Sequence, residues 1–299
     1  MFKGSIVAIV TPFKNGRVDE GKFKELVEFQ IKNGIHGIVP CGTTGESPTL
    51  THEEHHRVIE LCVEAAKKRV PVIAGTGSNS TAEAVELTKH AAKVGADGAL
   101  VVTPYYNKPT QRGLYLHFKA VAESVKIPII LYNIEGRTAR NIETDTVAKL
   151  AKDCKNIIGV KEASGKLEQV KAVRQATPKS FVILSGDDAL TLPIMDLGGV
   201  GVISVVANIV PQDVVKMIDL YNAGQKKKAQ DLNNKLRPLV DAMFVETNPI
   251  PVKKAMEFLG LCPADLRLPL CEPSDENAEK IRTALVEYGL MAETSSAKR

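Results

Sequence analysis

Short apolar runs alternate with amphipathic stretches along most of the chain. A cluster of Gly, Pro, Thr or Ser closes each run, and a segment with apolar residues at helical spacing follows it. We predict buried strands at residues 5–13, 36–42, 71–77, 98–104, 128–133, 157–163, 181–186 and 201–208. Continuous apolar runs of this kind are typical of parallel strands that helices cover. Eight evenly spaced units favour a closed α/β fold, the (β/α)8 TIM barrel, over an open doubly wound sheet.

The pattern changes after Pro211, where only helical periodicity remains. We expect the eighth barrel helix at about 211–222 and further helices near 225–244, 249–259 and 274–288. The sequence therefore predicts a catalytic barrel at 1–210, a C-terminal helical extension at 223–290 and a disordered tail at 291–299.

Two capping boxes mark the starts of helices. Glu54 follows Thr51 at a distance of three residues, and Glu83 follows Ser80 in the same way. At this spacing each side chain can bind the backbone N–H group of the other residue. Gly95 lies where a glycine would end the second helix. We expect helices that begin directly after Thr51 and Ser80.

Composition narrows the class of protein. The 299 residues are 44% hydrophobic and 25% charged, as in a globular protein with a sizeable core. The formal charge of +4 comes with no basic stripe, which argues against nucleic acid as a partner. No apolar run reaches the length of a membrane span, so we expect no membrane association. Five scattered cysteines suit reduced thiols and a cytoplasmic location better than disulfides.

A lysine at the end of a buried strand is the first candidate for chemistry. Lys161 follows the apolar residues 157–160, and alone it would be interpreted as a strand end whose ammonium reaches water. In a barrel, however, active sites lie at the carboxyl ends of the strands. Desolvation there would favour the neutral amine, which can attack a carbonyl and form a Schiff base.

Further polar side chains follow the same strand ends. Tyr132 closes the strand beside that of Lys161, and Thr43 and Thr44 lie in the turn after the second strand. Hydroxyls in these places can relay protons or hold a carboxylate. Arg137, just beyond Tyr132, offers a guanidinium fork for a second carboxylate. Each residue also has an ordinary structural explanation, such as a buried tyrosine or a surface arginine, so the set carries more weight than its members.

Three other motifs could indicate zinc, dinucleotide or phosphate binding, but each fits its pattern poorly. Residues 52–56 match the zinc pattern H-E-x-x-H, but they lie in the first turn of a helix and no third ligand follows. Residues 75–77 lack the third glycine of a dinucleotide-binding loop. Asp187 and Asp188 follow the seventh strand, near which many barrels bind phosphate, so we expect a substrate without phosphate. We predict no metal site.

Five motifs occur together in one known family: GTTGE (42–46), TPYYNKP (103–109), YN..GRT (132–138), GVKEASG (159–165) and SGDD (185–188). From about residue 4 to residue 290 the chain resembles the dihydrodipicolinate synthase family of pyruvate-dependent class I aldolases. The resemblance implies condensation of pyruvate with L-aspartate 4-semialdehyde to 4-hydroxy-tetrahydrodipicolinate, in lysine and diaminopimelate biosynthesis. It also implies a homotetramer that needs no cofactor beyond a covalent imine with its substrate.

The resemblance assigns roles to individual residues. Lys161 would form the imine with pyruvate, and Tyr132, Thr43 and Tyr106 would relay protons, with Tyr106 coming from a neighbouring subunit. Substrate contacts would come from Thr44 on the pyruvate carboxylate, Arg137 on the carboxylate of the aldehyde, and Gly186 and Ile203 in the pocket wall.

The resemblance further implies feedback inhibition by lysine. In lysine-inhibited members, an effector site at a subunit interface uses positions that match Ser47, His52, His55, Asn79, Glu83 and Tyr105.

Two departures from the family pattern concern the loop that carries Arg137. Glu135 replaces the usual proline, and Ala139 replaces the usual glycine. Proline stiffens a loop, so this loop is expected to sit differently here. Glu135 also adds negative charge near a site for two carboxylates, which leaves an altered aldehyde partner open.

Three alternatives stay open at this point. Lys161 and Tyr132 would also serve another pyruvate aldolase or a 2-keto acid dehydratase. The H-E-x-x-H motif would serve a zinc hydrolase. The same barrel without turnover would be a sensor of keto acids or of lysine.

Overall fold

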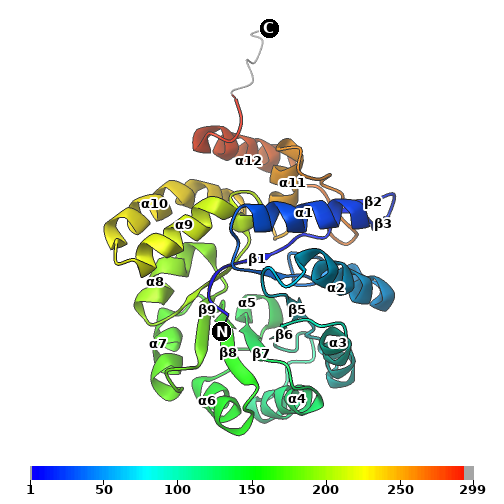
Figure 1. Ribbon diagram of the computed structural model, residues 1–299, viewed down its shortest axis with the longest axis vertical. Helices are drawn as coiled ribbons and strands as arrows, with labels where there is room; N and C mark the ends of the chain where they lie inside the picture. Colours follow the sequence, from blue (N-terminus) through cyan, green and yellow to red (C-terminus); the bar gives the residue numbers. More distant parts are fainter. Residues whose placement is uncertain (1, 293–299) are drawn as a thin grey trace.

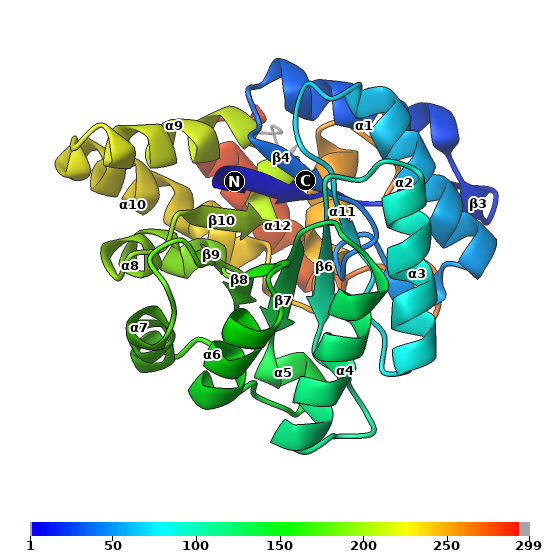
Figure 2. The same cartoon turned by 60° about the horizontal axis from the view of Figure 1, so that its bottom comes forward.

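The computed structural model of the chain describes residues 2–292 and contains one eight-stranded parallel sheet. Its strands are β1 (Gly4–Ala8), β4 (Gly37–Val39), β5 (Ile73–Gly75), β6 (Gly98–Val102), β7 (Ile129–Asn133), β8 (Ile157–Glu162), β9 (Val182–Ser185) and β10 (Gly201–Ser204). Neighbours in the sheet run β4-β1-β10-β9-β8-β7-β6-β5. A parallel bridge from Ile38 to Val72 joins the β4 and β5 ends of this series, so the sheet forms a nearly closed barrel (Figure 2).

Helices surround this barrel and cover the outer faces of its strands (Figure 1). They are α1 (Glu20–Lys32), α2 (His52–Ala66), α3 (Thr81–Lys93), α4 (Gln111–Ser124), α6 (Thr144–Asp153), α7 (Leu167–Ala176), α8 (Thr191–Asp196) and α9 (Pro211–Asn222). The predicted (β/α)8 fold is confirmed, and α9 coincides with the predicted eighth helix. A short helix, α5 (Glu135–Thr138), lies beyond the end of β7, at the carboxyl ends of the strands (Figure 2).

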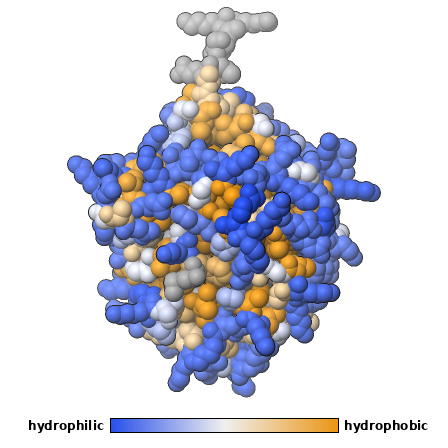
Figure 3. All heavy atoms as spheres, in the orientation of Figure 1, coloured by the Kyte–Doolittle hydropathy of each residue, from blue (hydrophilic) through white to orange (hydrophobic). Residues whose placement is uncertain are grey.

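Apolar side chains form an inner and an outer layer. Ile6, Ile73, Leu100 and Ile130 are buried inside the barrel, whereas side chains such as Phe118 are buried between strands and helices. Hydrophilic residues dominate the periphery of the face shown in Figure 3, and patches of hydrophobic residues appear among them. The continuous apolar runs of the sequence are explained by strands that are buried on both faces.

Three more helices, α10 (Lys226–Ala242), α11 (Ile250–Phe258) and α12 (Asp275–Tyr288), stack beside α9 and α1 (Figure 1). Leu239 of α10 and Leu285 of α12 are fully buried in the same apolar cluster as Val27 of α1. The extension therefore shares a core with the barrel, and the domain boundaries at 210 and 223 stay a prediction. The predicted tail falls largely on residues 293–299, which lie outside the described residues. Within residues 2–292, no helix combines the length and apolar character needed to cross a bilayer.

The first strand is shorter than predicted. β1 ends at Ala8, and the remainder of the predicted 5–13 run leads into a hairpin of β2 (Phe13–Lys14) and β3 (Arg17–Val18). Asn15 and Gly16 form its turn with φ angles of 53° and 74°. An Asn-Gly pair is the sequence signal for such a turn, because both positions need positive φ.

The eighth strand also ends early, at Ser204 instead of Asn208. The buried carboxylate of Asp188 accepts the N–H groups of Val205 at 2.8 Å and Val206 at 3.2 Å. These bonds draw the backbone out of the sheet and into a short 3-10 turn, η3 (Val206–Asn208).

One of the two predicted capping boxes is confirmed. Thr51 and Glu54 bind each other's backbone N–H groups at the start of α2. Although α3 begins after Ser80 and Gly95 follows its end with φ of 89°, the Ser80 side chain caps nothing. Glu83 instead accepts hydrogen bonds from Ser78 and His52, so the predicted box at Ser80 is wrong.

Candidate active site

Lys161 and Tyr132 lie side by side at the carboxyl end of the barrel. They are register partners on β8 and β7, and successive side chains of a strand point to opposite faces, so both point to the same face of the sheet. The Lys161 Nζ lies 4.1 Å from the centroid of the Tyr132 ring, and each residue is 6% exposed. Lys161 is therefore not a strand-end lysine whose ammonium reaches open water.

A small cavity of about 50 Å³ adjoins Lys161. A Cβ at Gly186, just after β9, would lie 2.9 Å from the Lys161 Cε and 2.5 Å from the Ala163 Cβ. Only glycine leaves room for the lysine side chain at this wall. The cavity is lined by Ala8, Val39, Gly42, Thr43, Thr44, Leu100, Tyr132, Ile134, Arg137, Lys161, Gly186, Val205, Phe244 and Asn248.

Hydroxyl, amide and guanidinium groups share this cavity. Thr43 and Thr44 line it from the turn after β4, and the Thr44 hydroxyl accepts a hydrogen bond from the Asn248 Nδ2 at 3.0 Å. Arg137, on α5, donates to the backbone oxygen of Asn248 at 3.0 Å. The guanidinium and the hydroxyls can each bind a carboxylate. The arrangement thus brings an amine, hydroxyl groups and a guanidinium to one cavity.

Two predicted residues do not line this cavity. Tyr106 lies in the loop after β6 and has a φ of 70°. Its side chain is 89% exposed, so the ring points away from the rest of the subunit. Ile203 of β10 is buried in the barrel interior with Ile6 and Leu184, and Val205 lines the cavity instead.

Asp187 and Asp188 have structural contacts. The Asp187 side chain accepts the N–H of Ala189 at 2.8 Å, at the start of the 3-10 turn η2 (Asp188–Leu190). Burial raises the pKa of Asp188, while hydrogen bonds from Ser204 and the backbone of Val205 act in the opposite direction. These contacts give no support to a charge barrier against phosphate, and a substrate without phosphate stays a prediction.

The predicted effector residues surround a second, larger cavity of about 360 Å³. Ser47, from the 3-10 turn η1 (Ser47–Thr49), lines it together with His52, His55, Glu83 and Tyr105. Thr43, Tyr132 and Arg137 line the same cavity and also the small cavity beside Lys161, so the larger cavity extends from the predicted effector residues to that site. Asn79 is the exception among the six, since it does not line the cavity and its backbone oxygen accepts the Asn107 side chain at 2.9 Å.

The ionisable groups of this cavity differ in their surroundings. The His52 Nε2 lies 2.7 Å from a carboxylate oxygen of Glu83, which raises the pKa of His52. Hydrogen bonds from Ser78 and His52 lower the pKa of Glu83. Burial lowers the pKa of His55 to about 4, and neither ring nitrogen of this 3% exposed side chain has a partner in the described chain. A buried imidazole without partners is suited to binding a polar ligand.

The residues of the H-E-x-x-H pattern do not converge. His52 binds Glu83, while the His56 ring stacks on His90 at 3.8 Å and faces Glu86 at 3.2 Å. Among residues 2–292, no three His, Cys, Asp or Glu side chains come together in a way that could hold a metal ion.

Comparison with known proteins gives a consistent result over the whole chain. A model of the dihydrodipicolinate synthetase family matches residues 1–288. The chain belongs to this family. It is 59% identical to the 4-hydroxy-tetrahydrodipicolinate synthase of Syntrophus aciditrophicus (strain SB) over 97% of this chain and 100% of that protein.

Solved structures of the dihydrodipicolinate synthetase family have the same fold. The crystal structure of dihydrodipicolinate synthase from Aquifex aeolicus superposes with a TM-score of 0.96 at 53% identity, over 97% of this chain and 99% of that one. The structure from Cyanidioschyzon merolae with lysine bound has a TM-score of 0.94 at 44% identity, over 97% and 99%.

The two departures from the family pattern can now be placed. Glu135 forms an ion pair of 2.5 Å with Lys166, and it lines neither cavity. Ala139 ends α5 with φ of 53°, a left-handed conformation that suits the glycine it replaces. Arg137 still lines the active-site cavity, so the altered loop keeps the guanidinium at the site.

Sequence reasoning missed the part of the site that the extension supplies. Phe244 and Asn248, which connect α10 to α11, line the cavity beside Lys161. The pair Asn248-Pro249 marks a turn, but no sequence pattern places it next to Thr44, which is 204 positions away.

Proposed function

We propose that this chain is a 4-hydroxy-tetrahydrodipicolinate synthase, a lyase that condenses pyruvate with L-aspartate 4-semialdehyde through a Schiff base on Lys161. The observation that carries the proposal is the nearly buried Lys161 amine beside the Tyr132 ring, at a cavity that hydroxyls and a guanidinium share. Relatives that align along the full length and bear this enzyme name support it.

The chemistry follows from the placement of these groups. The Lys161 amine attacks the keto carbon of pyruvate, water leaves, and loss of a proton from the methyl carbon gives an enamine. The enamine attacks the aldehyde carbon, and the amino group of the second substrate then displaces Lys161 and closes the ring. Tyr132 and Thr43 move the protons, Thr44 holds the pyruvate carboxylate, and Arg137 binds the other carboxylate. No cofactor is required for these steps.

We also propose a homotetramer that works in the cytoplasm, in lysine and diaminopimelate biosynthesis. Tyr106 is exposed on its own subunit, which fits a proton relay that a neighbouring subunit completes. The five free cysteines fit a reducing compartment. Sedimentation should give about four times the 32.3 kDa mass of one chain.

Borohydride trapping with pyruvate tests the proposal. Intact mass and peptide mapping should locate a pyruvate adduct on Lys161 in the wild-type protein and in a Lys166→Ala control, and none in Lys161→Ala. No adduct in a folded wild-type protein would refute the mechanism and favour a keto-acid sensor. An adduct without turnover of aspartate semialdehyde would indicate another pyruvate aldolase or a 2-keto acid dehydratase.

A second proposal is feedback inhibition by lysine at the larger cavity. Glu83 can bind an ammonium group, and the unpartnered His55 ring and the Tyr105 side chain offer further polar contacts. The lysine-bound relative from Cyanidioschyzon merolae supports the choice of ligand.

Initial rates measured against lysine concentration test this second proposal. Glu83→Gln should weaken inhibition, whereas Glu86→Gln is the matched control because Glu86 faces His56 and does not line the cavity. If lysine inhibited the wild-type protein, Glu83→Gln and Glu86→Gln equally, the lysine site would lie elsewhere. Dialysis against EDTA separates this proposal from the zinc hydrolase, which would lose activity.

A further inference from the structure

Behind the two catalytic side chains lies a buried carboxylate. Asn133 and Glu162 come directly after Tyr132 and Lys161 on β7 and β8, and they are register partners as well. Because side chains alternate along a strand, Asn133 and Glu162 point away from the barrel interior. Asn133 is fully buried and Glu162 is 2% exposed.

Neutral donors alone hold the Glu162 carboxylate. The Asn133 Nδ2 lies 3.1 Å from both carboxylate oxygens, the Gln169 Nε2 lies 3.1 Å from one of them, and the backbone N–H of Ser164 donates at 2.9 Å. Within the described part of the chain, no lysine, arginine or histidine forms an ion pair with Glu162. A buried charge of this kind is tolerated only where its hydrogen bonds are made, so it strongly constrains the donors around it.

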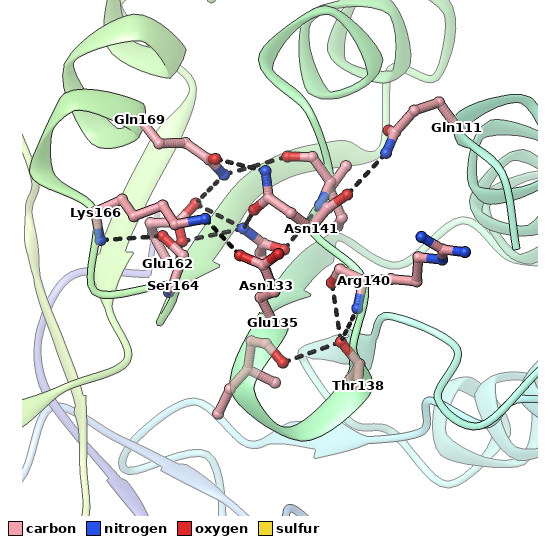
Figure 4. A network of polar contacts seen from close by, with 12 residues as sticks. Gln111, Asn133, Glu135, Thr138, Arg140, Asn141, Glu162, Ser164, Lys166 and Gln169 are labelled. Atoms are coloured by element: carbon pink, nitrogen blue, oxygen red, sulfur yellow. Dashed lines mark hydrogen bonds and ion pairs between the residues drawn. The ribbon is translucent and has the colours of Figure 1, made fainter. Parts of the chain in front are cut away.

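The same network fixes two loops of the active site (Figure 4). The Asn133 Oδ1 accepts the N–H of Ile142 at 2.9 Å, and its Nδ2 donates to Asn141 at 2.8 Å, where the loop that carries Arg137 returns. Asn141 in turn donates to the Gln169 side chain at 2.7 Å. Through Ser164, Glu162 holds the loop that follows Lys161. One cluster therefore connects the ends of β7 and β8 with both loops.

We propose that Glu162 and Asn133 are positioning residues that hold Lys161, Tyr132 and the Arg137 loop in their reactive arrangement. The proposal rests on the proposed function for its kinetic effects, but the position of Lys161 can be measured independently. A displacement of about 1 Å in a reacting group lowers a rate by roughly a hundredfold. Loss of the network should thus lower the rate of chemistry more than it weakens pyruvate binding.

Exchange of donors and acceptors across the pair gives a sharp test. In Glu162→Gln, the new NH₂ group faces donors wherever it points, and in Asn133→Asp two carboxylates face each other. Each single variant should form the pyruvate adduct at least about tenfold more slowly at saturating pyruvate, with a smaller change in KM. The double variant places an acceptor at 133 opposite a donor at 162, but the new NH₂ group still faces the Ser164 N–H or the Gln169 amide, so this variant should recover part of the lost rate.

The control is Gln30→Leu, which removes a buried amide that donates to the backbone of Ala207 at 2.8 Å. Its adduct rate should stay near that of the wild type, even where its thermal stability falls as much as that of the single variants. Double-variant rates no higher than those of the single variants, or a Gln30→Leu rate that falls equally, would overturn the proposal.

Acylation with acetic anhydride, followed by peptide mapping, measures the position of Lys161 without any substrate. In Glu162→Gln, Lys161 should be acetylated faster relative to Lys280, a surface lysine on α12 far from this network, because the end of β8 is less firmly held. Unchanged labelling would overturn the positioning role. A wild-type protein that forms no pyruvate adduct would refute the proposed function, while the labelling ratio would still decide this inference.

Discussion

The buried ion pair between Lys253 and Glu46 should be worth several kcal/mol when one partner is removed. Both side chains are 0% exposed, and their charged atoms lie 2.5 Å apart. Lys253, on α11, also donates to the backbone oxygen of Asp265 at 2.6 Å, and Glu46 also accepts the N–H of Arg267 at 3.1 Å. Burial lowers the pKa of Lys253, and the neighbouring Glu46 charge opposes that shift.

Lys253→Met leaves the Glu46 carboxylate buried without a cation. Breaking a buried pair in this way costs about 3–5 kcal/mol. That is a large part of the roughly 5–15 kcal/mol that stabilises a typical domain. The double variant Glu46→Gln, Lys253→Met removes both charges and keeps an acceptor for Arg267, so it should recover at least about 2 kcal/mol of the loss.

Urea unfolding at fixed protein concentration measures these differences, because binding between subunits makes apparent stability depend on concentration. Lys254→Met is the matched control, because Lys254 is the next residue in the chain and pairs at the surface with Glu257 and Glu272. The control should lose at most about 1 kcal/mol. A Lys253→Met loss below about 1 kcal/mol, or a double variant no more stable than the single one, would refute the reasoning.

Two further predictions concern backbone strain and pH. Ala139→Gly should raise the free energy of unfolding by about 1 kcal/mol, because glycine adopts the left-handed φ of 53° without a steric cost; an unchanged or lower thermal midpoint would contradict this. Burial lowers the pKa of His117 from its ordinary 6.5 to about 4. Between these two pH values the unfolded chain binds more protons than the folded chain, so the free energy of unfolding falls as the pH drops from 6.5 to 4. His117 should account for about 3 kcal/mol of the loss in denaturant unfolding at pH 4, so His117→Asn should show a decline that is shallower by about this amount.

The sequence was sufficient for the barrel because each strand is buried on both faces and closed by Gly, Pro, Thr or Ser. It also placed Lys161 at the carboxyl end of the barrel, because a residue at the end of a parallel strand lies at that end of the sheet. The predicted ends of β1 and β10 were wrong, because the chain leaves the sheet before these apolar runs end: it turns into the β2–β3 hairpin in one case and toward the Asp188 carboxylate in the other.

Contacts between distant segments were beyond sequence reasoning. Asn248 reaches Thr44, and Lys253 reaches Glu46, across more than two hundred positions. Glu83 has the spacing of a capping residue, but His52 and Ser78 offer it stronger partners in three dimensions. Local patterns predict local bonds, and they fail where a tertiary partner competes.

The alternation along β7 and β8 has a consequence for how this enzyme can evolve. Tyr132 and Lys161 point to the chemistry, and the next residues, Asn133 and Glu162, hold the surrounding loops. An insertion or deletion of one residue within either strand would exchange these two roles, because the side-chain period is two. Point substitutions in the loops beyond these strands, such as those at positions 135 and 139, leave that alternation intact. Substitutions in these loops can therefore change the surroundings of Lys161 without moving it to the other face of the strand.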